Sequence, residues 1–301
     1  MKAYRQLPDG QSIFLDHHGH FVPDMDAASD ALERLGFILT PYTMHTMTTA
    51  PGEEPKPSGT ANRCIMLRES YLEVLCAVGD APLAQQLNAA LARYTGMHLM
   101  AFSTPDAEGQ HLRLTEAGFD MQPLVHLTRE VEGGTLRFSV IRLQPGQMPE
   151  GRIQFLNHRT PDLLWREELM NHPNKVVSMT DVVMASADPA EAIGRFQRYL
   201  GVAPETCKGG ARFRFGRGSL TILTPNALLA VLPDTDILDL PFIAAYSLRS
   251  EDLAATKAYL AKNHIATAEL TDDMFRVEPL PALGSTMIFT QGAAQAHWMA
   301  L

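Results

Sequence analysis

The chain has 301 residues, of which 46% are hydrophobic and 20% are charged, and its formal net charge is −9. This length favours two domains, and the composition is that of a folded globular protein. The acidic balance, without a cluster of Lys and Arg, argues against a nucleic-acid partner. No apolar run approaches the ~20 residues of a membrane span. The first residues lack the apolar core of a secretory signal, so we expect a cytoplasmic location.

One helical pattern recurs four times along the chain. The segments FVPDMDAASDALERLGF and STPDAEGQHLRLTEAGF share their spacing, with an offset of 82 residues between Asp24 and Asp106. ASADPAEAIGRFQRYLGV repeats the pattern from Asp188, and SLRSEDLAATKAYLAKNHI repeats it from Ser250. Each segment begins with a residue type that caps helices and ends with Gly or Asn, and its apolar residues recur at helical spacing. The sequence therefore predicts four amphipathic helices.

Short runs typical of β-strands surround each of these helices. FILTPYTM, NRCIMLR and SYLEVLCAV follow the first helix, and QPLVHLTREV, TLRFSVIRL and GRIQFLN follow the second. ARFRFG and SLTILT follow the third, and MFRVEP and STMIFT follow the fourth. We therefore predict an α+β fold of four βαβββ units. Paired units would form two domains, at residues 1–170 and 171–301.

A repeated βαβββ unit whose first strand carries LDHHGHFVPD and whose last strand carries YLEVL resembles the vicinal oxygen chelate superfamily. This superfamily includes glyoxalase I, the extradiol dioxygenases and the bleomycin resistance proteins. The phrases GTANRCIML, SYLEVL and QFLNHRTPDLLW resemble more narrowly its glyoxalase-like branch. The predicted fold of the superfamily extends over the whole chain, but its sequence motifs occur only in the first two units. It implies that each pair of units forms a cupped half-barrel, with a divalent metal inside.

The resemblance places one metal ligand on the first strand, seven residues before the acidic residue that opens the helix. Counting back from Asp24 gives His17. Because successive side chains of a strand point to opposite faces, His18 and His20 would then face away from His17. A histidine-rich strand end that binds no metal is the alternative.

Glu73, in the apolar strand YLEVL, is the second ligand that the resemblance implies. A buried carboxylate needs a cation or a hydrogen-bond donor, whereas a solvent-facing Glu is the plain alternative. In the second unit, the offset of 82 puts Leu99 at the position of His17, and His98 lies one residue out of register. His98 would need a slip or bulge to bind. The resemblance also implies a ligand from the last strand of each unit, and His158, in QFLNHRTPDLLW, lies at that place in the second unit.

Two imidazoles and one carboxylate suit Fe, Mn, Zn or Ni and leave coordination positions for a substrate. In the superfamily, two adjacent substrate oxygens chelate such a metal. Proton transfer needs a base beside it, for which Glu73 and His126 are the candidates. Substrate contacts are expected from residues that also have ordinary surface or packing roles: Asn62, Arg63, Arg159 and Trp165.

The last two units lack these ligands. Their first strands, MTDVVMASAD and LPFIAAYSLRS, contain no His, and their last strands contain neither His nor an acidic residue. We interpret this half as structural, covering the site or forming a homodimer face. Extradiol dioxygenases also keep one active and one inactive domain, but in the reverse order, which weakens the case for that chemistry.

Two functions from different classes follow from this pattern. The first is a divalent-metal-dependent lyase, isomerase or dioxygenase that acts on a small oxygenated substrate. The second is a non-catalytic protein that sequesters a small molecule, as the bleomycin resistance proteins do. An assembly module that keeps only the fold is a third, less favoured interpretation.

Overall fold

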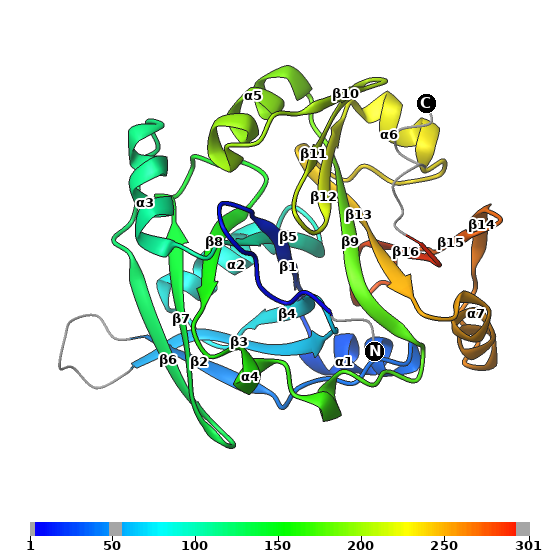
Figure 1. Ribbon diagram of the computed structural model, residues 1–301. Helices are drawn as coiled ribbons and strands as arrows, with labels where there is room; N and C mark the ends of the chain where they lie inside the picture. Colours follow the sequence, from blue (N-terminus) through cyan, green and yellow to red (C-terminus); the bar gives the residue numbers. More distant parts are fainter. Residues whose placement is uncertain (1–3, 48–55, 293–301) are drawn as a thin grey trace.

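Two eight-stranded mixed sheets form the framework of the computed structural model, which describes residues 4–47 and 56–292 (Figure 1). The first sheet has the strand order β2-β3-β4-β1-β5-β8-β7-β6. The second has the order β10-β11-β12-β9-β13-β16-β15-β14. Both orders follow one pattern, in which the first strands of two units pair antiparallel at the centre of the sheet.

Two βαβββ units make the first sheet. The first unit comprises β1 (Phe14–Phe21), α1 (Met25–Arg34), β2 (Thr43–Met47), β3 (Lys56–Met66) and β4 (Tyr71–Ala77). Helix α2 (Pro82–Leu91) connects it to the second unit. The second unit comprises β5 (Gly96–Ser103), α3 (Ala107–Glu116), β6 (Val125–Val131), β7 (Gly134–Arg142) and β8 (Arg152–His158).

The second sheet repeats this arrangement. After α4 (Pro161–Leu164) and the 3-10 helix η1 (Glu167–Leu169), the third unit comprises β9 (Val176–Ala185), α5 (Pro189–Leu200), β10 (Glu205–Cys207), β11 (Gly210–Arg214) and β12 (Ser219–Leu223). Helix α6 (Pro225–Val231) leads to the fourth, with β13 (Phe242–Ser250), α7 (Leu253–Lys262), β14 (Ala268–Thr271), β15 (Met274–Val277) and β16 (Thr286–Thr290). The predicted four units and their pairing into two half-barrels are confirmed.

Side-chain caps begin the helices of the four units. The carboxylate of Asp24 accepts hydrogen bonds from the backbone N–H groups of Asp26 and Ala27, at 2.9 and 3.0 Å. Caps of the same kind are made by Asp106, Asp188 and Asp252. The prediction of Ser250 as the fourth cap was therefore wrong. Ser250 still belongs to β13, and its hydroxyl accepts a hydrogen bond from the N–H of Asp252.

Replacing Asp24 with Ala is expected to lower the free energy of unfolding by about 1 kcal/mol, because two N–H groups of the first helical turn lose their acceptor. Urea unfolding followed by circular dichroism measures the change. Asp30→Ala, at an exposed position of the same helix, is the matched control and should stay within about 0.5 kcal/mol of the parent. Equal effects of the two substitutions would contradict the capping role.

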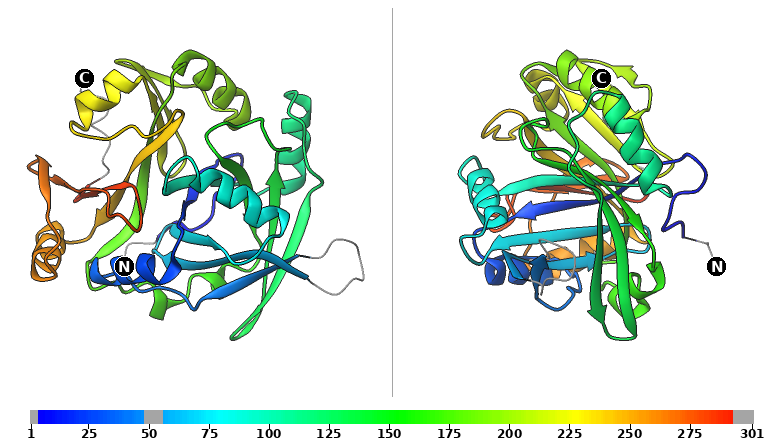
Figure 2. Two further views of the ribbon diagram at one scale, coloured as in Figure 1. Left: turned by 180° about the vertical axis from the view of Figure 1, so that it is seen from behind. Right: turned by 90° about the vertical axis from the view of Figure 1, so that its left-hand side faces the viewer.

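The two sheets pack against each other through their central strands (Figure 2). One apolar core cluster includes Leu15 and Met100 from the first sheet and Val182 and Tyr246 from the second. The same cluster takes in residues of helices α1, α3, α5 and α7. The faces that carry the helices are therefore buried between the two halves, and the opposite face of each sheet is left to form a cup.

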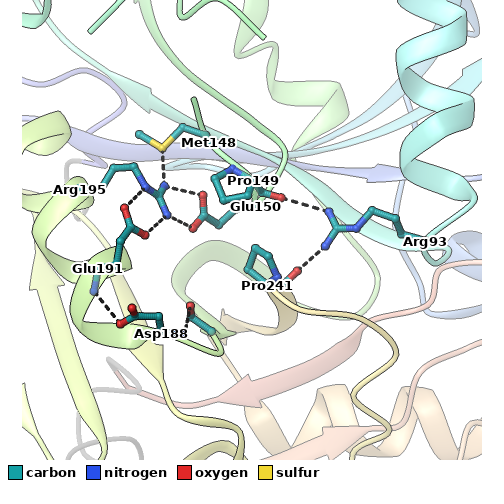
Figure 3. Close-up of polar contacts among 9 residues, drawn as sticks. Arg93, Met148, Pro149, Glu150, Asp188, Glu191, Arg195 and Pro241 are labelled. Carbon is teal, nitrogen blue, oxygen red and sulfur yellow. Dashed lines mark hydrogen bonds and ion pairs between the residues drawn. The ribbon is translucent and has the colours of Figure 1, made fainter. Parts of the chain in front are cut away.

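An ion pair also joins the two halves (Figure 3). Glu150, in the loop before β8, is fully buried and accepts two hydrogen bonds of 2.8 Å from the guanidinium of Arg195 on α5. Glu191, one helical turn before Arg195, binds the same guanidinium from the solvent side. Nearby, Arg93 donates to the carbonyl oxygens of Pro149 and Pro241, which belong to different halves.

The helices seen in residues 4–47 and 56–292 are all too short or too polar to cross a membrane.

Candidate functional site

The face of the first sheet that points away from helices α1 and α3, here called the cup face, carries a row of polar side chains. Leu15, Leu72 and Ile153 pack in the core cluster with the helices, so strand alternation turns the residues between them to the cup face. Pairing register aligns Tyr71 on β4, His17 on β1, Ala101 on β5 and Gln154 on β8. Ala101 is the one small side chain in this row and packs in an apolar cluster with Phe21 and Leu99.

Four charged or titratable side chains form a continuous chain on this face. Nε2 of His17 lies 3.7 Å from a carboxylate oxygen of Glu73. Nδ1 of His17 lies 3.6 Å from Asp16, and the Asp16 carboxylate accepts from Nε2 of His158 at 2.8 and 2.9 Å. All four residues are buried. The structure therefore brings the three predicted ligands into one network, but it inserts Asp16 between the two histidines.

Asp16 was not predicted as part of the site. A β-bulge between Leu15 and His17 shifts the register of β1 against β5, which lets two consecutive side chains reach the same network. Burial would raise the pKa of Asp16, but His158 and His17 together hold that pKa below its ordinary value. The carboxylate is thus ionised; it orients the His158 imidazole by hydrogen bonds and lies 3.6 Å from Nδ1 of His17.

The arrangement of His158 fixes its tautomer. A carboxylate can only accept hydrogen bonds, so Nε2 of His158 carries the proton that faces Asp16, and the lone pair of Nδ1 remains available. The Trp165 ring packs edge-on against His158 at a centroid distance of 5.1 Å. A buried imidazole held by a carboxylate in this way can take up or release a proton at Nδ1.

Among the predicted substrate contacts, Asn62 and Trp165 lie at the network. The side-chain amide of Asn62 donates to Glu73 at 2.6 Å, which orients that carboxylate. Trp165 is buried against His158 and Tyr71, and its indole N–H has no hydrogen-bond partner among the described residues. Each residue therefore contacts a member of the network, Asn62 at Glu73 and Trp165 at His158.

Arg63, His126 and Arg159 lie elsewhere. Arg63 points toward α1, where it donates to the carbonyl oxygen of Thr40 and faces Glu33. His126 is exposed on the opposite face of β6, where its ring meets Ser139 and Arg159. The structure does not bring these three side chains to the cup face. Arg63 and His126 point to the opposite face of their strands, and Arg159 follows the last residue of β8.

The remaining histidines of the β1 and β5 strands face the second sheet. Nδ1 of His20 donates to the carbonyl oxygen of Leu283 at 2.9 Å, and Nε2 accepts from the Tyr246 hydroxyl at 3.2 Å. His18 packs against the Tyr246 ring at 4.0 Å. His98 donates to the carbonyl oxygen of Tyr94 at 2.8 Å. These imidazoles have structural partners and are turned away from His17.

The second sheet carries a closed ion pair at the matching place. Asp181 on β9 lies seven residues before Asp188, as His17 lies seven before Asp24. Its carboxylate pairs with Arg212 at 2.8 Å and also accepts from the Ser219 hydroxyl. In the second sheet, the carboxylate at the position of His17 is therefore neutralised by an arginine of the same sheet.

The cup face offers two donors that could share one metal ion, His17 and Glu73. No three His, Cys, Asp or Glu side chains of residues 4–47 and 56–292 converge into a group that could hold an ion. His17 and Glu73 fit as a pair, since two donors about 2 Å from one tetrahedral ion lie about 3.4 Å apart, near their 3.7 Å. His158 is engaged with Asp16 instead. In the second unit, Gln154 holds the place of Glu73 and offers a neutral oxygen.

A family model described as a glyoxalase-like domain matches residues 15–200 of the chain. No curated protein that was compared matches it. A hypothetical protein from Staphylococcus aureus has a similar structure, with a TM-score of 0.64 and 10% identity over 92% of this chain and 98% of that one. A mutant of 4-hydroxymandelate synthase from Streptomyces coelicolor gives 0.57 and 15%, over 94% of each chain. An Mn(II)-bound glyoxalase from Novosphingobium aromaticivorans gives 0.54 and 11%, over 93% and 82%. At these identities the structures share the fold.

Proposed function

The chain belongs to the glyoxalase-like domain family, and on that premise we propose that it is a divalent-metal-dependent enzyme acting on a small oxygenated substrate at the cup face of its first sheet. Membership of the vicinal oxygen chelate superfamily, predicted from the sequence, is confirmed. The observation that carries the proposal is the buried pair of His17 and Glu73, whose donor atoms face each other at a distance suited to one shared ion.

His17 and Glu73 would hold the metal, and two neighbours would support them. Asn62 keeps one carboxylate oxygen of Glu73 in place, and Asp16 faces the other ring nitrogen of His17. Such outer partners orient metal ligands and are typical of metal sites. A bound divalent ion would polarise adjacent oxygens of the substrate as a Lewis acid.

We assign proton transfer to His158 rather than to His126. The Asp16 carboxylate fixes His158 as the tautomer with a free Nδ1, and Trp165 covers the ring. A buried base held in one orientation is suited to moving a proton to or from a substrate carbon or oxygen. Glu73, which the sequence also suggested as a base, would serve as a metal ligand in this scheme.

Elemental analysis of the untagged protein tests the assignment. We expect about one divalent metal per chain, lost in His17→Ala and in Glu73→Gln and retained in His158→Ala, because His158 is engaged with Asp16. His126→Ala, at an exposed position outside the cup face, is the matched control and should retain the metal. Circular dichroism verifies that each variant is folded.

Metal that stays stoichiometric in both His17→Ala and Glu73→Gln would refute the ligand pair. Metal lost in His158→Ala would return that residue to the ligand role predicted from the sequence. A metal-free parent protein that still binds an aromatic ligand would favour the sequestration function instead.

A further inference from the structure

Two arginines lie side by side on the cup face without a charged partner. Arg152 begins β8, and Arg142, at the end of β7, is paired in register with Gln154, two residues further along β8. Alternation along β8 puts Arg152 and Gln154 on the same face. Both guanidiniums line a cavity of about 250 Å³, together with Phe21, Ala90, Gln122 and Met148.

Neither guanidinium forms an ion pair with a carboxylate in residues 4–47 and 56–292. Nε of Arg142 reaches only the amide oxygen of Gln154, at 3.4 Å. Arg152 lies over the Phe21 ring at 5.6 Å. Burial, followed by repulsion from Arg152, lowers the pKa of Arg142 to about 10, and burial lowers the pKa of Arg152. Strand register connects the cavity to the metal site, because Arg152 on β8 lies in one cross-strand row with Leu99, Gly19 and Glu73. The negative charge of Glu73 accordingly raises the pKa of both arginines.

The arginines that are most deeply buried in the described part of the chain are paired with carboxylates. Arg195 is paired with Glu150, Arg212 with Asp181, and Arg276 with Glu278. Arg142 and Arg152, in contrast, face a cavity side by side and repel each other. Holding like charges together is costly unless an anion is bound between them.

We propose that Arg142 and Arg152 bind an oxyanion of the substrate, a carboxylate or a phosphate, in this cavity. The inference deepens the proposed function, because the anion would belong to the molecule whose oxygens approach His17 and Glu73. Arginine forks match the geometry of both oxyanions and form charge-assisted hydrogen bonds with them. The volume suits a small organic acid, since a cavity of about 150 Å³ holds benzene.

Isothermal titration calorimetry on the full chain, after treatment with a chelator, tests the proposal with benzoate and inorganic phosphate as separate probes. We expect one of them to bind the parent protein. Arg142→Gln and Arg152→Gln should each weaken this binding tenfold or more. Arg137→Gln, at an exposed position of the same strand β7, is the matched control and should leave it unchanged. The probe that binds distinguishes a carboxylate site from a phosphate site.

Thermal unfolding without the probe supplies a second readout. Because the two guanidiniums repel each other, Arg142→Gln and Arg152→Gln should unfold at the parent temperature or above it. Failure of both probes to bind the parent would overturn the proposal. So would unchanged affinity in the variants, or variants that unfold or lose many degrees of stability, since the guanidiniums would then be structural. Because metal is removed beforehand, a failed metal assignment leaves this test intact.

Discussion

Replacing Glu150 with Gln is expected to lower the free energy of unfolding by about 3 to 5 kcal/mol, which would be a large part of the stability of an ordinary domain. Glu150 is fully buried and receives both terminal nitrogens of Arg195 at 2.8 Å. Without the negative charge, the guanidinium of Arg195 stays buried between the halves with only the exposed Glu191 to compensate it. Urea unfolding, compared with the parent, measures the loss.

Glu191→Gln is the matched control for this prediction, because it removes the other carboxylate on the same guanidinium. Glu191 is exposed and lies one turn away on α5, so its loss should cost about 0.3 to 1 kcal/mol. A combined Glu150→Met and Arg195→Met variant should recover most of the stability, since apolar side chains of similar size often replace a buried ion pair at no cost. Equal effects of Glu150→Gln and Glu191→Gln would contradict the role of the buried pair.

Acidification from pH 7 to pH 4 is expected to destabilise the protein by several kcal/mol, because three buried histidines are held neutral. Burial is the main cause that lowers the pKa of His20, His98 and His172 to about 4 each. At His172, the hydrogen bond that Nε2 donates to the carbonyl oxygen of Met66 raises the pKa, whereas the bond that Nδ1 accepts from the N–H of Ile38 requires the neutral ring. Protonation of Nδ1 would break the second bond.

The direction follows from the protons bound by each state. An unfolded His titrates near pH 6.5, so between that pH and 4 the unfolded chain binds more protons than the folded one. Stability therefore falls as the pH falls through this window. One pKa unit corresponds to about 1.4 kcal/mol, so each ring contributes a loss of up to about 3 kcal/mol.

Urea unfolding at a series of pH values measures this slope. His98→Gln keeps an N–H donor for the carbonyl oxygen of Tyr94 but cannot titrate, so the slope between pH 6.5 and 4 should become smaller. His126→Gln, at an exposed site, should leave the slope unchanged. A slope that is the same in His98→Gln as in the parent would show that this ring does not control the acid response.

The local signals in the sequence predicted the fold because each has a direct physical cause. Asp before an apolar stripe and Gly after it mark where a helix begins and ends, and all four repeats carry both or a close substitute. The count of seven residues back from Asp24, which came from the resemblance, selected His17, and the structure places its side chain beside Glu73 on the cup face. Its role as a metal ligand stays a prediction. His18 and His20 then turn away by alternation alone.

The rest of the site depends on register, which side-chain spacing does not reveal. The bulge that brings Asp16 beside His17 is a property of the pairing of β1 with β5. The meeting of Arg142 and Arg152 depends on how β7 pairs with β8. Gln154, by contrast, was within reach of the sequence, because RIQFL aligned on YLEVL puts it at the place of Glu73.

The C-terminal half contacts the histidines of β1 that face the second sheet. His20 is anchored on Leu283 and Tyr246, and His18 rests on the same Tyr246, so both lie on the strand that carries His17. The C-terminal half therefore packs against the strand that positions His17, although it contributes no side chain to the network of His17, Asp16, Glu73 and His158. Substitutions at Tyr246 would for this reason reach the site through the backbone of β1.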